Sequence, residues 1–169
     1  MKKLLAIILA ILSVCSILAC GGDKYANLNI NVDGFGRNII RSCTFDYQAD
    51  VLDDPDTAAA NLKIDPSLLN TVDGKPEIFY SVVAGFPEGV FVIGAKDAAS
   101  AKTISEGPVK DWLKYNRDGY STYGPEQVPK IDSAINRVCG RYVFVIVSAD
   151  NAGAKNVLNG LLDSAIKIS

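Results

Sequence analysis

The sequence of 169 residues contains no histidine. This absence excludes Ser-His-Asp and Cys-His nucleophile systems, and it removes the commonest zinc ligand and the side chain that titrates most readily near neutral pH. A catalytic site would have to use carboxylates, lysine or tyrosine. Because no spacing of acids marks a facing pair, the sequence assigns no catalytic or metal-ligating residue. We expect a protein that is not an enzyme and that carries no cofactor.

Positive charge is also scarce, with 17 basic residues against 19 acidic ones. No cluster of basic residues with interleaved aromatic side chains is present. An acidic surface repels the phosphate backbone of nucleic acids. The composition therefore predicts that nucleic acid is not a partner.

One long uncharged stretch, residues 4–19, follows Lys2 and Lys3 at the N-terminus. A basic head, an apolar stretch and a final small residue form the order of a secretory signal. Sixteen residues are short for a permanent membrane span, which needs about 20. The sequence therefore predicts a signal helix, residues 1–19, that is cleaved and lies outside the folded domain.

The end of this stretch, Ile17-Leu18-Ala19-Cys20, resembles the lipobox of bacterial lipoproteins. The resemblance implies that the Cys20 thiol receives diacylglycerol and that cleavage falls between Ala19 and Cys20. Two acyl chains hold a protein at a membrane far more firmly than one. We expect a lipid anchor in the cell membrane at its extracytoplasmic face, followed by a flexible tether over residues 20–26. A plain signal peptide with a chance cysteine, or an uncleaved anchor, is the alternative.

Without residues 1–19 the chain has 150 residues, which suffice for one domain and are too few for two lobes around a cleft. We predict a single domain over residues 27–169. Cleavage removes Lys2 and Lys3 and no acid, so 15 basic and 19 acidic residues remain and the net charge is about −4.

Two of the four cysteines remain for the folded domain, because Cys15 leaves with the signal and Cys20 carries the lipid. Cys43 and Cys139 would then lie in an oxidising location, where disulfides persist. They either form a disulfide or lie apart as buried thiols that behave as small hydrophobic side chains.

The strand patterns predict two hairpins. The β-rich runs 78–84 and 90–95 flank a Gly-Phe-Pro-Glu-Gly turn, and the runs 135–138 and 141–148 flank Cys139-Gly140. Alternating apolar residues over 27–32 indicate one further strand-like segment.

Helices are expected between and after these strands. Their predicted ranges are 33–43 with Asp33 as N-cap, 55–62, 66–70, 97–115 with a kink or break at Gly107-Pro108, 125–131, and a final helix capped by Asp150. The order predicts an α+β fold, with an antiparallel sheet of about four strands and helices packed on one face. Residues 92–102 and 145–155 match at six of eleven positions, so the two hairpin-helix units are either an internal duplication or a chance likeness.

A tyrosine-rich run provides the candidate binding residues Tyr115, Arg117, Tyr120 and Tyr123. Tyrosine and arginine are the residues that anchor interfaces, and tyrosine rings also stack on sugars. We predict a loop that binds an envelope protein or a glycan. The alternative is that these tyrosines cover the core beside Trp112.

Two other motifs favour structural roles. Gly34-Phe35-Gly36 begins a near match to a dinucleotide-binding fingerprint, but Ile39 stands where the third glycine belongs, so a capped helix start is favoured. Asp53, Asp54 and Asp56 could offer oxygen ligands to calcium, but they lack the glycine turn and distal glutamate of an EF-hand loop. Helix capping is therefore the favoured role of these aspartates.

Five short motifs carry a resemblance to a known family: Ile64-Asp65-Pro66, Pro87-Glu88, Lys96-Asp97, Tyr123-Gly124-Pro125-Glu126 and Gly140-Arg141-Tyr142. Their order over residues 28–165 resembles a family of small bacterial lipoproteins, mostly from Gram-positive anaerobes, that carry a domain of unknown function. The resemblance implies an envelope location and an α+β layout, and it assigns no catalytic residue. We therefore expect a non-enzymatic lipoprotein that binds a partner at the envelope, the alternative being an envelope hydrolase that uses carboxylates and tyrosine.

Overall fold

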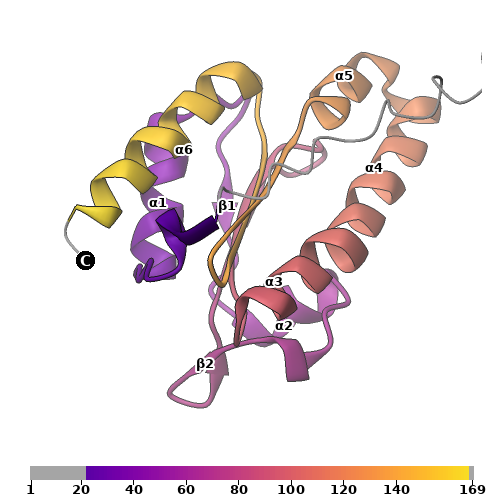
Figure 1. The fold of residues 1–169 in the computed structure, drawn as a ribbon. Coiled ribbons are helices and arrows are strands. Elements are labelled where there is room, and N and C mark those ends of the chain that lie inside the picture. The colour runs from indigo at the N-terminus through magenta and orange to yellow at the C-terminus, as the bar shows by residue number, and fades with distance from the viewer. Residues whose placement is uncertain (1–21, 168–169) are drawn as a thin grey trace, which may run out of the picture.

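The computed structural model describes residues 22–167 and shows an α+β fold (Figure 1). Five antiparallel strands form one sheet in the order β1-β4-β5-β7-β6, and β2 pairs with β3 in a small separate hairpin. The strands are β1 (Asp50–Val51), β2 (Thr71–Val72), β3 (Lys75–Pro76), β4 (Ile78–Val82), β5 (Gly89–Gly94), β6 (Ile135–Cys139) and β7 (Tyr142–Val147). Both predicted hairpins, β4–β5 and β6–β7, are confirmed, and β1 adds a fifth strand along the edge of β4.

Four of the helical elements begin at the aspartate caps that the sequence indicates. The helical elements are η1 (Gly22–Tyr25), α1 (Val32–Ser42), α2 (Pro55–Asn61), η2 (Pro66–Leu68), α3 (Ala98–Ile104), η3 (Ser105–Val109), α4 (Lys110–Tyr123), η4 (Pro125–Gln127), α5 (Val128–Asp132) and α6 (Asn151–Ile166). The side chains of Asp54, Asp65, Asp97 and Asp150 each accept a backbone N–H of the helix that follows. Such caps satisfy amide groups that a helix start leaves without partners.

Helices cover both faces of the sheet, so the prediction that they pack on one face is wrong. In Figure 1 α1 and α6 lie on one side of the sheet, and α2, α3 and α4 lie on the other. We call these the α1/α6 layer and the α2–α4 layer. Every residue of β5 and β7 is buried, because alternate side chains of an apolar strand enter cores on opposite faces.

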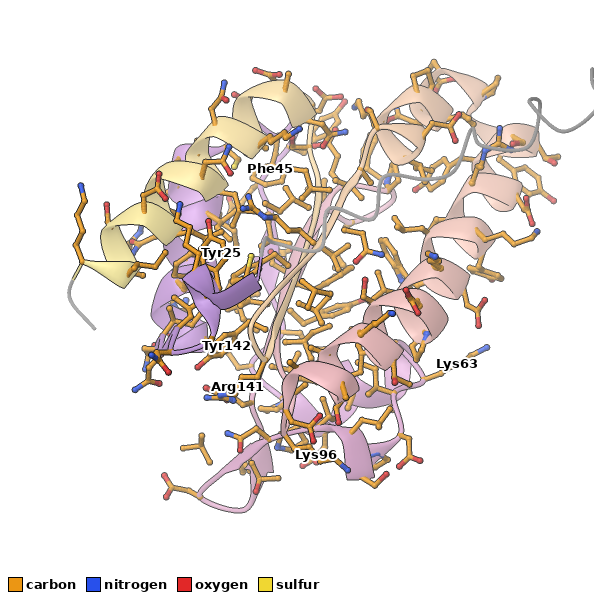
Figure 2. All side chains as sticks on the ribbon, in the orientation of Figure 1. Tyr25, Phe45, Lys63, Lys96, Arg141 and Tyr142 are labelled. Atoms are coloured by element: carbon orange, nitrogen blue, oxygen red, sulfur yellow. The ribbon has the colours of Figure 1, made fainter. Side chains whose placement is uncertain are left out.

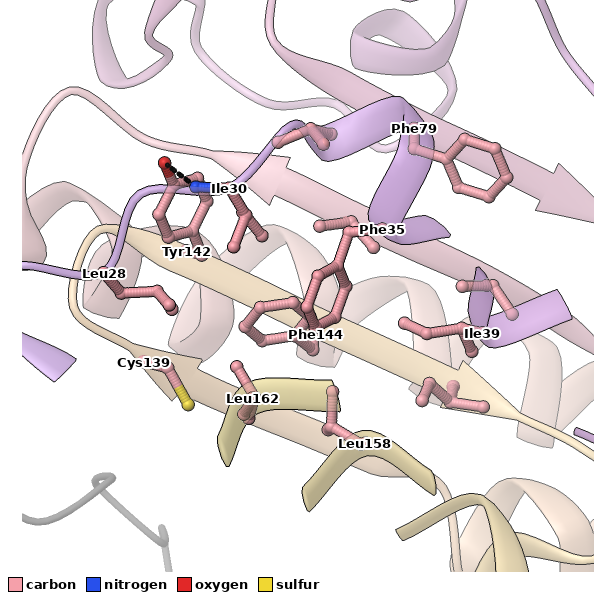
Figure 3. Packing of buried hydrophobic residues seen from close by; sticks show 14 of the residues in the cluster. Leu28, Ile30, Phe35, Ile39, Phe79, Cys139, Tyr142, Phe144, Leu158 and Leu162 are labelled. Carbon is pink, nitrogen blue, oxygen red and sulfur yellow. Dashed lines mark hydrogen bonds between the residues drawn. The ribbon is translucent and has the colours of Figure 1, made fainter. Parts of the chain in front are cut away.

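The core beneath the α1/α6 layer is aromatic and aliphatic (Figure 3). Phe35 of α1 meets Phe144 of β7 with ring centroids 5.3 Å apart. The backbone N–H of Ile30 donates to the Tyr142 hydroxyl at 3.3 Å. The same hydroxyl donates to Asn29 Oδ1 at 3.5 Å. The segment before α1 is thereby fixed to the sheet by hydrogen bonds as well as by packing.

Residues 28–31 pair with no strand, Asn27 lies in a turn and Val32 begins α1, so the prediction of a strand-like segment over 27–32 is wrong. Leu28 and Ile30 are buried as the alternation indicates, because an extended chain that packs one side on a core shows the same period as a strand. Asn31 rather than Asp33 caps α1, since its side chain accepts the N–H of Gly34. Asp33 instead pairs with Arg37 one turn on.

The tyrosine-rich run is helical, which corrects its prediction as a loop. Asp97 starts a helical stretch that continues through α3, η3 and α4 to Tyr123. Pro108 does not end this stretch, because η3 is a wider π-type turn that accommodates the missing N–H of proline. The run from Tyr115 therefore lies on the C-terminal half of α4.

The two hairpin-helix units differ in structure. Val92 and Val145 occupy matching places in the sequence, yet Val92 enters the core beneath the α1/α6 layer and Val145 enters the opposite one. The helices that follow, α3 and α6, likewise lie on opposite faces. The likeness of the two segments is therefore local, and it does not repeat one arrangement.

The predicted signal helix, the cleavage site at Ala19 and the lipidation site at Cys20 lie outside the described residues. Among the residues that the structure describes, no helix is both long and apolar enough to cross a bilayer. Residues 20–26 were expected to form a flexible tether, but the chain is already docked at Lys24 and Tyr25. The folded part therefore begins earlier than predicted.

Candidate functional site

Among the described residues, four of the surface pockets have similar volumes, 410 to 580 Å³, so their chemistry must distinguish them. The pocket between α2 and α4 has a volume of 510 Å³ and three aromatic side chains in its wall. We call it the aromatic pocket; its residues are Asn61, Leu62, Lys63, Tyr80, Pro108, Asp111, Trp112, Tyr115 and Asn116. An apolar wall with a few polar groups is typical of small-ligand sites.

The aromatic wall is held in place by the sheet. Tyr80 of β4 stacks on Phe91 of β5 with ring centroids 4.6 Å apart and 18° between the planes. Trp112 of α4 meets the same ring edge-on at 4.8 Å and 87°. Because Phe91 is completely buried, both pocket rings rest on a fixed support, and a ligand would meet a largely preformed surface.

Polar groups form the rim of the aromatic pocket. Asn116 donates its amide to the Trp112 carbonyl oxygen, which leaves its own carbonyl oxygen as an acceptor. Asp111 contributes a carboxylate and Lys63 an ammonium group. Burial raises the pKa of Tyr80, so its hydroxyl stays protonated near neutral pH and can both donate and accept.

Lys63 has an unusual backbone conformation, with φ at 53°. It directly follows the C-cap of α2, where the N–H of Lys63 donates to Ala60 and the N–H of Ile64 donates to Ala59. This pair of bonds is a Schellman motif, whose left-handed position is usually glycine. A side chain there costs backbone strain, and strain of this kind is concentrated at functional sites.

The structure separates the four predicted binding residues. Tyr115 lines the aromatic pocket and its side chain is 79% exposed. Tyr123 is 90% exposed at the end of α4, Arg117 pairs with Asp132 at 2.7 Å, and Tyr120 is partly buried, which raises its pKa. Only Tyr115 reaches the pocket.

The alternative role of these tyrosines as a cover for the core fits neither Tyr115 nor Tyr123, because both are exposed. The core of the α2–α4 layer is instead covered by Trp112 and Leu113, which are partly buried against it. Sequence reasoning missed Tyr80 and Lys63 as pocket residues. Nothing in the sequence around either residue indicates a pocket, because they come together only where the sheet packs against α2 and α4.

The alternative prediction, an envelope hydrolase, requires two carboxylates that face each other across a substrate. In the aromatic pocket Asp111 is the single acid. Elsewhere Lys130 holds both Asp46 and Glu88, and Glu88 is only 1% exposed. The hydrogen bond from Lys130 lowers the pKa of Asp46, and neither acid lines any of the four pockets.

The aspartates weighed as calcium ligands serve α1 and α2. Asp54 accepts the N–H of Asp56 and the hydroxyl of Thr57, and Asp53 lies 3.6 Å from Arg37. Within residues 22–167, no group of three or more acids, cysteines or histidines is placed to hold a metal ion.

The glycine-rich motif at residues 34–36 has a packing role. A Cβ at Gly36 would lie 2.1 Å from the ring of Phe79. Glycine therefore allows α1 to approach the sheet closely. This packing accounts for Gly36, and no dinucleotide site is needed to explain it.

The two cysteines of the domain lie in the α1/α6 layer and are not joined by a disulfide. Cys43 is half-buried at the end of α1, and Cys139 is buried at the end of β6. Burial, with a smaller contribution from the charge of Asp150, raises the pKa of Cys43 to about 11. Its thiol is therefore protonated and unreactive near neutral pH.

Comparison with protein-family models, with curated proteins and with solved structures finds no match to this chain. The features of this chain that bear on function are therefore the aromatic pocket and the signal and lipobox pattern at the N-terminus.

Proposed function

We propose that the protein is a lipoprotein, anchored through Cys20 at the extracytoplasmic face of the cell membrane, that binds an envelope ligand in the aromatic pocket without catalysing a reaction. The observation that carries the proposal is the convergence of Tyr80, Trp112 and Tyr115 on one pocket of 510 Å³. The N-terminal signal and lipobox pattern supports the location. The small-lipoprotein resemblance agrees with it.

The pocket favours a glycan over an envelope protein. Sugar rings present a C–H face that stacks on aromatic rings and hydroxyls that pair with amides and carboxylates, and both kinds of partner line this pocket. Its volume suits one or two sugar units. Protein interfaces are broader, at about 800 Å² for each partner.

A hydrolase remains the second candidate class, but no observation favours it. Cleavage of a glycosidic bond generally uses two carboxyl groups about 5 to 9.5 Å apart across the scissile bond. The pocket offers Asp111 alone. Binding without cleavage is therefore the function that the geometry supports best.

Trp112 makes binding directly measurable, because it is the single tryptophan of the chain and lines the pocket. We expect neutral oligosaccharides prepared from bacterial cell wall to shift the fluorescence of the lipidated protein. Tyr115→Ala should weaken binding about tenfold, since a stacked aromatic contact of this kind contributes more than 1 kcal/mol at binding hot spots.

Tyr123→Ala is the matched control, because Tyr123 lies on the same helix, is exposed and does not line the pocket. It should leave the affinity unchanged. Equal affinities for both variants, or no fluorescence change with any oligosaccharide, would contradict the glycan proposal.

The anchor is tested separately. Cys20→Ser should abolish labelling by a radioactive or clickable fatty acid and should leave uncleaved precursor in the membrane. Unchanged processing of this variant would refute the lipobox assignment.

A further inference from the structure

The first described turn of the chain is docked on the α1/α6 layer. Tyr25 is only 4% exposed and belongs to the core of that layer. Its hydroxyl accepts a hydrogen bond from Arg137 at 3.2 Å, and the Arg137 guanidinium lies 5.7 Å from the centre of its ring. Lys24 pairs with Asp163 of α6 at 2.8 Å. In Figure 2 the Tyr25 label lies between η1 and α6.

The backbone at Tyr25 is also fixed. Its carbonyl oxygen accepts the N–H of Leu28 at 3.1 Å. A Cβ at Gly140, in the turn between β6 and β7, would lie 2.3 Å from the same oxygen. The chain at Tyr25 therefore lies directly against this turn, and only glycine permits the approach.

This docking limits how far the lipid can lie from the domain. Tyr25 follows Cys20 by five positions, and an extended chain spans at most about 3.6 Å per residue, or about 18 Å in all. A domain of 150 residues has a radius of gyration of about 15 Å, which corresponds to a diameter of about 40 Å. The lipid attachment point is therefore closer to the surface formed by η1, the C-terminal half of α6 and the β6–β7 turn than to the far side of the domain. We call this surface the N-terminal corner.

The charge of the corner is compatible with lipid headgroups. Lys24, Arg137 and Lys167 all act electrostatically on a single acid, Asp163. Basic residues near a membrane surface are attracted to anionic lipids, by about 1 kcal/mol each. Against these three basic residues stand Asp163 and, within η1, Asp23, so the corner is slightly basic whereas the whole chain is acidic.

We propose that the corner formed by η1, the C-terminal half of α6 and the β6–β7 turn lies against the phospholipid headgroups of the membrane that holds Cys20, so that the aromatic pocket opens away from the bilayer. The pocket belongs to the α2–α4 layer, on the opposite face of the sheet (Figure 1). The arrangement rests on the lipid anchor of the proposed function. It would hold the pocket toward ligands outside the membrane instead of toward lipid.

Two helical glycines provide matched labelling sites. Gly160 of α6 and Gly119 of α4 are both exposed, and a Cβ at either position meets no atom within 4 Å. Gly160→Cys and Gly119→Cys, each combined with Cys43→Ala, would carry a fluorophore on the lipidated protein in vesicles of phosphatidylglycerol and phosphatidylcholine. A nitroxide on the lipid headgroups serves as quencher.

We expect several-fold stronger quenching at position 160 than at position 119. A twelve-residue Gly-Ser insertion between Gly21 and Gly22 should reduce the difference, because it frees the corner from the anchor. Equal quenching at both positions in the uninserted protein would overturn the inference. Fatty-acid labelling of Cys20 is measured on the same samples, so a missing lipid refutes the proposed function, and a lipidated protein with equal quenching refutes the orientation alone.

Discussion

The two helical layers differ in how deeply their helices are buried. In the α1/α6 layer, Ile39, Leu158 and Leu162 are completely buried. In the α2–α4 layer, the long helix α4 has no fully buried residue, although α3 does. The α1/α6 layer carries the docked N-terminal corner, whereas α4, which has no fully buried residue, borders the aromatic pocket.

The difference indicates a division of roles within one domain. A helix with a fully buried stripe is fixed to the sheet by the hydrophobic effect. Around α4 the contacts with the sheet are made by partly buried side chains such as Trp112 and Leu113. Functional sites and the less stable parts of a structure often coincide for this reason.

The largest effect is expected from breaking the ion pair through which Lys130 of α5 holds Glu88. Helix α5 lies beside α4 (Figure 1). Lys130→Met leaves the buried Glu88 carboxylate without its cation, which should cost about 3 to 5 kcal/mol of unfolding free energy. Urea denaturation measures this loss. The double variant Lys130→Met with Glu88→Gln should recover most of the lost unfolding free energy. A loss below about 1 kcal/mol in the single variant would show that the Lys130–Glu88 ion pair contributes little to stability.

The ion pair between Lys130 and Glu88 also makes the stability of the domain depend on pH. Burial lowers the pKa of Lys130, but its hydrogen bonds with Asp46 and Glu88 outweigh burial and raise the pKa overall. The contribution of a lysine with a raised folded pKa is fully present below its ordinary pKa and is lost as pH rises through the folded value. The stability difference between the wild type and Lys130→Met should therefore shrink in strongly alkaline solution. The part that comes from Asp46, whose pKa Lys130 lowers, should shrink in acid, as pH falls through the folded pKa of that carboxyl.

The next test compares the layers directly with one substitution in each. Leu158→Ala, in the α1/α6 layer, removes a completely buried side chain and should cost about 2 to 5 kcal/mol. Leu113→Ala, in α4, removes a partly buried one, so its cost should be clearly smaller. Thermal and urea unfolding measure both variants, and equal losses would remove the proposed contrast between the layers.

The smallest expected effect has the opposite sign. Lys63→Gly should stabilise the domain by about 0.5 to 1 kcal/mol, because glycine adopts a positive φ without strain. It should also weaken glycan binding, since it removes an ammonium group from the rim. Lys63→Ala retains the strain and should weaken binding without the gain in stability; a gain of equal size in both variants would contradict the strain argument.

The local features of the fold could be predicted from the sequence. Asp54, Asp65, Asp97 and Asp150 cap the helices assigned to them, because capping needs only residues two or three positions apart. Both hairpins follow from short β-rich runs around a turn, and Gly140 has the positive φ that such a turn requires. The prediction failed at Asp33, where Asn31 competes for the same role.

Contacts between distant segments could not be predicted in this way. The run at Tyr115 contains small turn-forming residues, so it favoured a loop, yet the π-type turn at Pro108 lets the helix continue through it. Of the predicted binding residues Tyr115 alone lines the pocket. Its partner Tyr80 is 35 positions away, and nothing in either segment indicates the other.

The sequence by itself determined the capped helix starts, the hairpins and the α+β class, and it also predicts a lipid on Cys20. Only the tertiary structure decided that helices cover both faces, that the chain is docked at Tyr25 and that Tyr80, Trp112 and Tyr115 share a pocket. The physical reason is the distance along the sequence over which each kind of contact acts. Caps and turns are satisfied within a few residues, whereas a face of a sheet is covered by whichever distant segments bury the most apolar surface there.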